Sequence, residues 1–154
     1  MKLYCMRHGL AANVEDDVKR NLTNQGRRDV EKIARHLSLH QNTIKQIFHS
    51  GILRAAQTAD IISNGLPVQS LQAAPELLSE TGSVDAITNI LLTWKQDTLL
   101  VGHLPLLFQL VNALVIGNAN HEPIVDFSPG SIVCLDLLSP QHWIIEWMIC
   151  PSIL

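Results

Sequence analysis

The sequence has few charged residues, no long apolar stretch and few cysteines. Only 16% of its 154 residues are charged, whereas 47% are hydrophobic, a balance that excludes a disordered or tail-like protein. It has no run of five or more basic residues, and its net charge of -3 gives no electrostatic footprint for nucleic acid. Its apolar runs fall far short of the roughly 20 residues that span a membrane. Since only one lysine and a few apolar residues precede Arg7, we also expect no secretory signal peptide.

The cysteines are three in number, Cys5, Cys134 and Cys150, and all lie in apolar, strand-like runs. An odd number in such surroundings favours buried thiols in a reducing compartment. A catalytic thiol requires polar, electropositive surroundings, which none of the three has in the local sequence. We therefore expect a cytoplasmic protein.

The length and the pattern of apolar residues predict one α/β domain over residues 1–154. Strand-like and helix-like periodicities alternate along most of the chain. They predict strands at 2–7, 44–49, 68–73, 98–101, 131–137 and 143–149, and helices at 23–39, 53–65, 83–94 and 105–116. Thr23 is the expected N-cap of the first helix. The short link at 139–142 favours a hairpin between the last two strands. The expected fold is a three-layer α/β/α sandwich whose sheet is mostly parallel with an antiparallel edge.

Two of the expected strands end in a histidine. The first strand runs into Arg7-His8-Gly9, and a later apolar strand ends in Gly102-His103. Chemistry in open α/β sheets sits at the carboxyl ends of strands. A guanidinium next to an imidazole suits phosphate, because arginine offers a planar fork of donors. Gly9 would let the backbone turn sharply and approach a ligand.

A third polar strand end leads to Arg54. It follows Ser50-Gly51 and lies at the start of an expected helix, which is already the positive end of the helix dipole. A cation there is reasonable if an anion binds at the same place. Two arginines and two histidines could thus meet at one phosphate-sized site, with Glu76 and Glu80 as the best-placed carboxylates.

Each of these residues also has an ordinary structural interpretation. A histidine at a strand end is often a satisfied polar residue, Arg54 could be a solvated helix residue, and Glu76 could cap a helix. His36 and His40 have the spacing of metal ligands, but no third ligand is suggested nearby, so we predict no metal site. The other histidines suggest no partners: His49, His121 and His142.

With these motifs the chain resembles the histidine phosphatase superfamily, and more narrowly the SixA-type phosphohistidine phosphatases. Matching segments run along nearly the whole length, at 6–9, 20–26, 53–58, 75–77, 102–106 and 147–148. Two positions depart from the family pattern. Ser50-Gly51 stands where the family often has Ser-Pro, and Gly102-His103 stands where Ser-His is common. Neither departure removes a charged group, and the resemblance implies a phosphoglycerate mutase-like fold.

The resemblance also implies roles for individual residues. His8 corresponds to the nucleophile that becomes phosphorylated, through a neutral ring nitrogen whose partner nitrogen is fixed by a backbone carbonyl. The phosphate pocket corresponds to Arg7, Arg54 and a protonated His103, and Arg20 matches a family arginine near it. Whether Glu76, Glu80 or neither acts as the acid/base stays open.

The implied activity is hydrolysis of phosphohistidine on a protein, such as a histidine phosphotransfer domain, with no metal or other cofactor. The short segments 10–22 and 117–130 would leave the pocket open to a folded partner. Two alternatives stay open. One is a small-molecule phosphomonoesterase of the same superfamily, and the other is a catalytically weak module that binds phosphate or a phosphoprotein.

Overall fold

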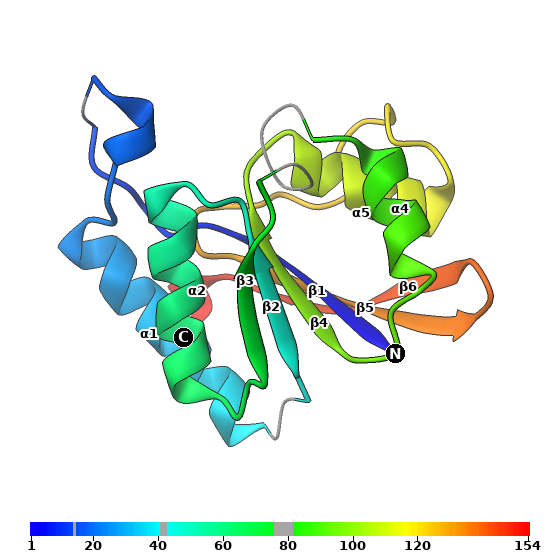
Figure 1. Ribbon diagram of the computed structural model, residues 1–154, viewed down its shortest axis with the longest axis horizontal. Coiled ribbons are helices and arrows are strands. Elements are labelled where there is room, and N and C mark those ends of the chain that lie inside the picture. The colour runs from blue at the N-terminus through cyan, green and yellow to red at the C-terminus, as the bar shows by residue number, and fades with distance from the viewer. Residues whose placement is uncertain (14, 41–42, 76–81) are drawn as a thin grey trace.

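The fold is built around one six-stranded sheet, with strand order β3-β2-β4-β1-β5-β6. The structure is a computed structural model that describes residues 1–13, 15–40, 43–75 and 82–154. The strands are β1 (Lys2–Arg7), β2 (Gln46–His49), β3 (Ser70–Ala73), β4 (Thr98–Gly102), β5 (Ile132–Ser139) and β6 (His142–Ile149). The helices are α1 (Asn24–Leu39), α2 (Leu53–Gly65), α4 (Val84–Leu91) and α5 (Leu106–Ile116), with short 3₁₀ turns η1 (Asp17–Lys19) and η2 (Pro151–Ile153) (Figure 1).

The sheet has the predicted mixture of strand directions. β1, β4, β2 and β3 pair in parallel, whereas β5 is antiparallel to both β1 and β6. The last two strands form the expected hairpin, and its turn residue Gln141 has a positive φ of 63°. A mostly parallel sheet with an antiparallel edge is thus confirmed.

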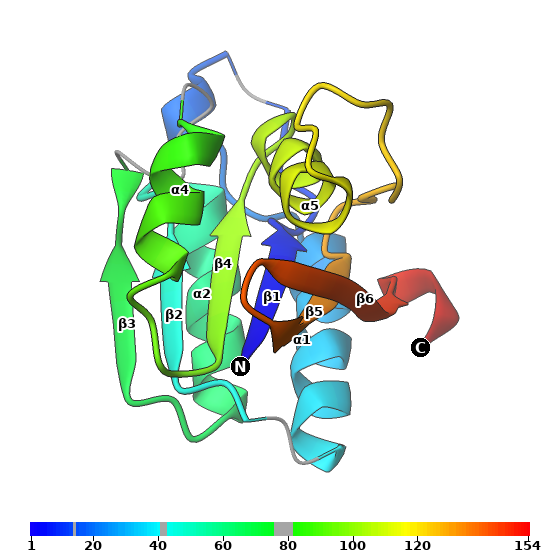
Figure 2. The same ribbon diagram turned by 90° about the vertical axis from the view of Figure 1, so that its right-hand side faces the viewer.

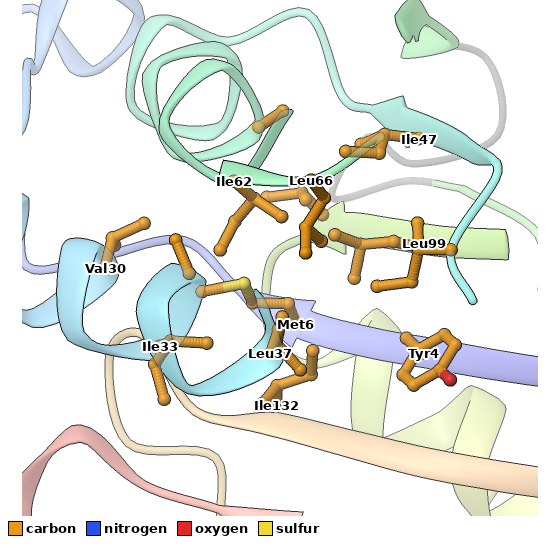
Figure 3. Packing of buried hydrophobic residues seen from close by; sticks show 14 of the residues in the cluster. Tyr4, Met6, Val30, Ile33, Leu37, Ile47, Ile62, Leu66, Leu99 and Ile132 are labelled. Carbon is orange, nitrogen blue, oxygen red and sulfur yellow. The ribbon is translucent and has the colours of Figure 1, made fainter. Parts of the chain in front are cut away.

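Helices cover both faces of the sheet, which confirms the three layers (Figure 2). Side chains alternate along each strand. Tyr4 and Met6 of β1 face α1 and α2, whereas Leu3 and Cys5 face α4 and α5. Figure 3 shows the first of these two cores. Its labelled residues come from both helices, from four strands and from Leu66, which directly follows α2: Tyr4, Met6, Val30, Ile33, Leu37, Ile47, Ile62, Leu66, Leu99 and Ile132.

The helix ends follow local sequence signals. Thr23 caps α1 as predicted, since its side chain accepts a hydrogen bond from the backbone N–H of Gly26 at 2.9 Å. The helix expected at 83–94 is shorter, because α4 ends at Leu91 and the chain then tightens into i→i+3 bonds. Trp94 leaves the helix and stacks on Phe48, with ring centroids 5.0 Å apart.

The order of the strands places a topological switch point at the carboxyl ends of the central strands β1 and β4. The neighbouring strands β1 and β4 are followed by α1 and α5, which lie on opposite faces. Ligands bind in the crevice at such a point, outside the carboxyl ends of the strands. The register pairs Arg7 with Gly102. His8 and His103, one residue further along, therefore leave the sheet side by side.

The cysteines largely fit the expectation. Cys5 and Cys134 are buried free thiols, and burial raises the pKa of Cys5 to about 12. Cys150 is free but only half-buried, because it lies just beyond the end of the edge strand β6. Within the described ranges, none of the helices has both the length and the apolar character to cross a membrane.

Candidate active site

His8 is held in one orientation by its own loop. Its Nδ1 lies 2.8 Å from the carbonyl oxygen of Gly9, so the ring donates from Nδ1 and keeps the lone pair on Nε2. Arg54 donates from Nε to this Nε2 at 3.2 Å. The residue is only 9% exposed. The backbone-carbonyl contact is the one expected from the sequence, and it leaves the lone pair of the ring on Nε2.

His103 lies against His8, with ring centroids 5.0 Å apart. Its Nε2 is 2.6 Å from Oγ of Ser50, a buried residue at the end of β2. Its Nδ1 is buried and has no hydrogen-bond partner. Three strand ends therefore contribute to one place, as the sequence predicted.

Burial is the main electrostatic influence on both imidazoles. It lowers the pKa of His8 to about 4, assisted by Arg54, Arg7 and Arg20 and opposed by the Gly9 carbonyl. It also lowers the pKa of His103 to about 4, assisted by His8 and Arg54. Both rings are neutral at pH 7. The protonated His103 implied by the family resemblance would therefore need a negative charge beside it.

Arg7 points from the end of β1 toward the loop that precedes β5. Its Nη1 donates to the carbonyl oxygen of Phe127 at 2.7 Å. Its Nε is buried without a partner, as is Nδ1 of His103. Unpaired buried polar groups cost free energy and are rare. In the described part of the chain, those two nitrogens are the buried side-chain atoms found without a partner, and both belong to this site.

Arg54 is 3% exposed and lies in the first turn of α2, as predicted. Besides His8, it contacts Asp17, which accepts hydrogen bonds from both terminal nitrogens of the guanidinium. The carbonyl oxygen of Asp17 is 2.8 Å from Nη1, and its Oδ2 is 3.0 Å from Nη2. Arg54 is therefore fixed by groups on both sides.

Arg20 reaches the site through Asp17 and does not contact His8 directly. Its Nη1 donates to Oδ1 of Asp17 at 3.1 Å, and its Nε donates to the carbonyl oxygen of Ala12 at 2.8 Å. Its charge still helps to lower the pKa of His8. The sequence reasoning placed Arg20 near the pocket but missed the carboxylate that connects it to Arg54.

The structure requires glycine at position 9 for close packing and not for the sharp turn that was expected. Its φ is not in the left-handed region. A Cβ at this position would lie 2.8 Å from Cγ2 of Val30 and 3.1 Å from the carbonyl oxygen of Gly26, so the missing side chain allows close packing on α1. Its N–H donates to Oγ1 of Thr58, which in turn donates to the carbonyl oxygen of Arg54. Gly9 thus connects the loop of His8 to both helices.

The departure from the family pattern at Gly51 also has a structural basis. Gly51 lies between β2 and α2 with a φ of 82°. Proline, whose φ is fixed near −65°, cannot adopt this conformation. The turn keeps Ser50 beside His103 without a proline.

Sequence reasoning missed Asp17 and Thr58 and left the carboxylate question open. Asp17 lies in a polar segment without periodicity, where its spacing of three residues from Arg20 was the available signal. Thr58 lies four residues after Arg54 in α2, inside a segment that matched the family. Glu76 and Glu80 lie outside the described residues.

The imidazole rings of His36 and His40, one turn apart at the end of α1, stack on each other. Their ring centroids are 4.1 Å apart, and Nδ1 of His40 is 2.8 Å from the carbonyl oxygen of His36. A search of the described ranges finds no group of three or more His, Cys, Asp or Glu side chains that could hold a metal ion. His49 accepts a hydrogen bond from the backbone N–H of Gly51 through Nδ1.

An apolar groove of about 450 Å³ lies next to Arg7 and His103. One wall continues from His103 into α5, and the other is the segment whose Phe127 carbonyl accepts from Arg7. The lining residues are Leu104, Phe108, Pro123, Ile124, Val125, Asp126 and Phe127. We refer to this set as the α5 groove.

Comparison with known proteins agrees with the family resemblance seen in the sequence. Residues 3–80 match the family model of the histidine phosphatase superfamily (branch 1). The chain is 29% identical to the phosphohistidine phosphatase SixA of Escherichia coli over 156 residues, covering 98% of this chain and 94% of that protein. It is 32% identical to an uncharacterized protein of Picosynechococcus over 132 residues, covering 79% of this chain and 78% of that protein. Among solved structures, the protein histidine phosphatase SixA complexed with tungstate superposes with a TM-score of 0.86 at 27% identity, covering 99% of this chain and 98% of that one.

Proposed function

This chain belongs to the histidine phosphatase superfamily and is a phosphatase, and we propose that it removes the phosphoryl group from a phosphohistidine on another protein. The observation that carries the proposal is the pair of buried, unpartnered nitrogens on Arg7 and His103, which follow neighbouring strands together with the oriented His8. We infer that an oxyanion bound beside His8 accepts hydrogen bonds from these nitrogens. A SixA structure holds tungstate, which is a tetrahedral oxyanion like phosphate.

The reaction proceeds through His8. Nε2 attacks phosphorus in line with the leaving group, so that a new N–P bond forms while the N–P bond to the substrate imidazole breaks. The electron pair stays on the leaving imidazole nitrogen. Water then attacks the phosphorus on His8, which releases inorganic phosphate and restores the neutral ring. The Gly9 carbonyl keeps the proton on Nδ1, so Nε2 stays unprotonated and carries the lone pair that attacks.

Arg7, Arg54 and His103 stabilise the charge on the transferring phosphoryl group. Arg54 already points its Nε at the nucleophilic atom, and it turns this donor to a phosphoryl oxygen as the N–P bond forms. His103 gains a proton when the phosphoryl dianion is beside it, because that charge opposes the effect of burial on its pKa. The arginines supply the positive charge, so the reaction proceeds without a metal.

A phosphohistidine substrate suits the groups available. An imidazole leaving group has a pKa of about 6.5, so it departs with much less help from a general acid than an alkoxide does. The α5 groove offers apolar side chains beside the phosphate pocket, where the surface around a phosphorylated histidine would lie. A histidine phosphotransfer domain in a signalling pathway is such a partner. We also propose a cytoplasmic location, which the free thiols of Cys5 and Cys134 support.

The test is dephosphorylation of a histidine-phosphorylated phosphotransfer domain by wild type, His8→Ala and His142→Ala, each with and without a chelator. His142 is an exposed residue of the hairpin and serves as the matched control. We expect rapid loss of label with wild type and His142→Ala, unchanged by the chelator, and loss of at least 10³-fold in rate with His8→Ala.

Other outcomes would contradict specific parts of the proposal. Hydrolysis of a generic aryl phosphate without action on the phosphoprotein would favour a small-molecule phosphatase. Label that moves to His8 and stays there would favour a binding module. A rate that falls with the chelator would exclude the metal-free reaction.

A further inference from the structure

Asp17 holds the buried guanidinium of Arg54 through two of its oxygen atoms. In the one turn of η1, its carbonyl oxygen accepts from Nη1 of Arg54 at 2.8 Å and its Oδ2 accepts from Nη2 at 3.0 Å. Its other carboxylate oxygen accepts from Arg20 at 3.1 Å. One residue thus presents two acceptors to a buried guanidinium and joins it to a second one.

These contacts use the part of arginine that binds phosphate. The two terminal nitrogens of a guanidinium form the fork that pairs with two oxygens of a carboxylate or phosphate. On Arg54 that fork faces Asp17, while Nε faces His8. A phosphoryl group that approaches His8 therefore meets an arginine already paired with an anion of this chain.

The two partners differ in their exposure to water. The side chain of Arg54 is 3% exposed, whereas that of Asp17 is 52% exposed. The carboxylate can leave the guanidinium and become hydrated at little cost, whereas Arg54 stays buried and needs an anion. The Arg20 and Arg54 guanidiniums lower the pKa of Asp17, so the carboxylate is ionised at neutral pH.

We propose that Asp17 is a positioning residue that acts as an internal counter-anion for Arg54 and Arg20, and that it sets how tightly the pocket holds phosphate. The inference rests on the proposed function only in that the pocket binds a phosphoryl group. With Asp17 in place, Arg54 stays aimed at Nε2 of His8 between turnovers. On binding, the phosphoryl group exchanges with the carboxylate, and after hydrolysis the carboxylate returns and helps inorganic phosphate to leave.

The test is the affinity for inorganic phosphate, measured by calorimetry and as the constant for product inhibition. We expect Asp17→Asn to bind phosphate about tenfold more tightly than wild type, a difference of about 1.4 kcal/mol. We also expect a lower KM and a lower kcat, because release is slower and Arg54 is less well oriented. Asp17→Glu, which keeps the charge, should bring the phosphate affinity back toward that of wild type.

Asp16→Asn is the matched control. It removes the same charge from the neighbouring position, where the side chain is 49% exposed and pairs with Lys19 at 2.8 Å. We expect phosphate affinity to change less than twofold in this variant. A general effect of net charge would move both variants equally and would overturn the proposal.

A merely structural role for Asp17 predicts the opposite sign. Loss of local structure would weaken phosphate binding, so weaker or unchanged binding by Asp17→Asn overturns the inference. If wild type hydrolyses phosphohistidine while this variant binds phosphate no more tightly, the inference fails alone. If no variant binds phosphate and wild type hydrolyses neither phosphohistidine nor an aryl phosphate, the proposed function fails with it.

Discussion

At the scale of single residues, the protonation of two adjacent imidazoles controls the site. In the proposed mechanism, His8 must be neutral to attack phosphorus, and His103 must be able to take up a proton beside the phosphoryl group. Burial lowers the pKa of each ring to about 4, in a pocket that also holds the buried side chain of Arg54, so both rings are neutral before a phosphoryl group binds. His8 is therefore neutral throughout the neutral pH range, as the proposed nucleophile must be, and in this mechanism the substrate supplies the negative charge that raises the pKa of His103.

This gives a prediction for the titration of both rings. In the folded protein, His8 and His103 should titrate with midpoints near pH 4, whereas in urea both should return to about 6.5. Saturating phosphate should raise the midpoint of His103 by more than one unit, because the dianion favours the imidazolium. The measurement is an NMR titration of the ring Cε1–H signals, assigned with His8→Gln and His103→Gln. A midpoint above 6 without phosphate would contradict the role of burial.

The same shift links stability to pH. Between about 4 and 6.5 the unfolded chain binds more protons at these histidines than the folded chain does, so the free energy of unfolding decreases as the pH falls. The slope is up to about 1.4 kcal/mol per pH unit for each histidine. Urea unfolding at several pH values checks it, and the decrease should be smaller in His103→Gln.

At the scale of secondary structure, the start of α1 holds the loop that carries His8. The N–H and hydroxyl groups of Thr23 donate to the carbonyl oxygen of Leu10 at 2.9 and 3.2 Å. Gly26 lies so close that a Cβ there would be 2.1 Å from this same oxygen. Leu10, which follows His8 and Gly9, is therefore held against the first turn of α1. Its backbone carbonyl packs directly on the backbone of Gly26.

Gly26→Ala should consequently damage both stability and activity. Because the clash is with backbone atoms of Leu10, either the loop or the helix must move. We expect a loss of about 1–3 kcal/mol in the free energy of unfolding and a fall in kcat of at least tenfold. Chemical denaturation and the phosphohistidine assay measure the two effects.

Gly65→Ala is the matched control for this prediction. Gly65 ends α2, and a Cβ there would approach Cβ of Ala34 at 3.3 Å, a side-chain atom that can shift slightly. This variant should keep its activity and most of its stability. Equal behaviour of the two variants would show that the packing of Leu10 on Gly26 does not position His8.

The elements that could be predicted from sequence are those with strong periodic patterns. β1, α2 and the cap of α1 agree with the expectation to within a residue. Their core-facing residues are apolar and recur at the spacing of a strand or a helix, so the sequence shows them clearly. The polar segment around Asp17 has no such spacing, so neither η1 nor its contact with Arg54 could be predicted. Gly9 was interpreted as freedom to turn, but its reason is the approach of Val30, which only the tertiary structure reveals.

At the scale of the whole molecule, the fold decides what can reach the proposed phosphate pocket. β1 and β4 bring His8 and His103 to the same edge of the sheet, while the helices that follow them separate to opposite faces (Figure 2). The α5 groove lies on one side of this edge, next to the groups that hold Arg7. A small phosphate ester needs only the pocket. A phosphohistidine on a folded protein also brings its surroundings, and these would cover the groove.

The groove therefore separates the two substrate classes in one experiment. Ile124→Ser reduces the apolar surface of the groove at a half-buried side chain without touching Arg7, His8, Arg54 or His103. We expect kcat/KM for a histidine-phosphorylated phosphotransfer domain to fall about tenfold, because apolar contacts of this size are worth about 1–2 kcal/mol. Hydrolysis of an aryl phosphate should stay within twofold of wild type.

Leu138→Ser is the control, since this apolar residue is 59% exposed near the hairpin, far along β5 from the site. Equal loss on both substrates would mean that Ile124 only supports the pocket, and no loss on either would mean that the protein partner contacts another face. A loss confined to the phosphoprotein would follow from a site that recognises the protein around the phosphohistidine as well as the phosphoryl group.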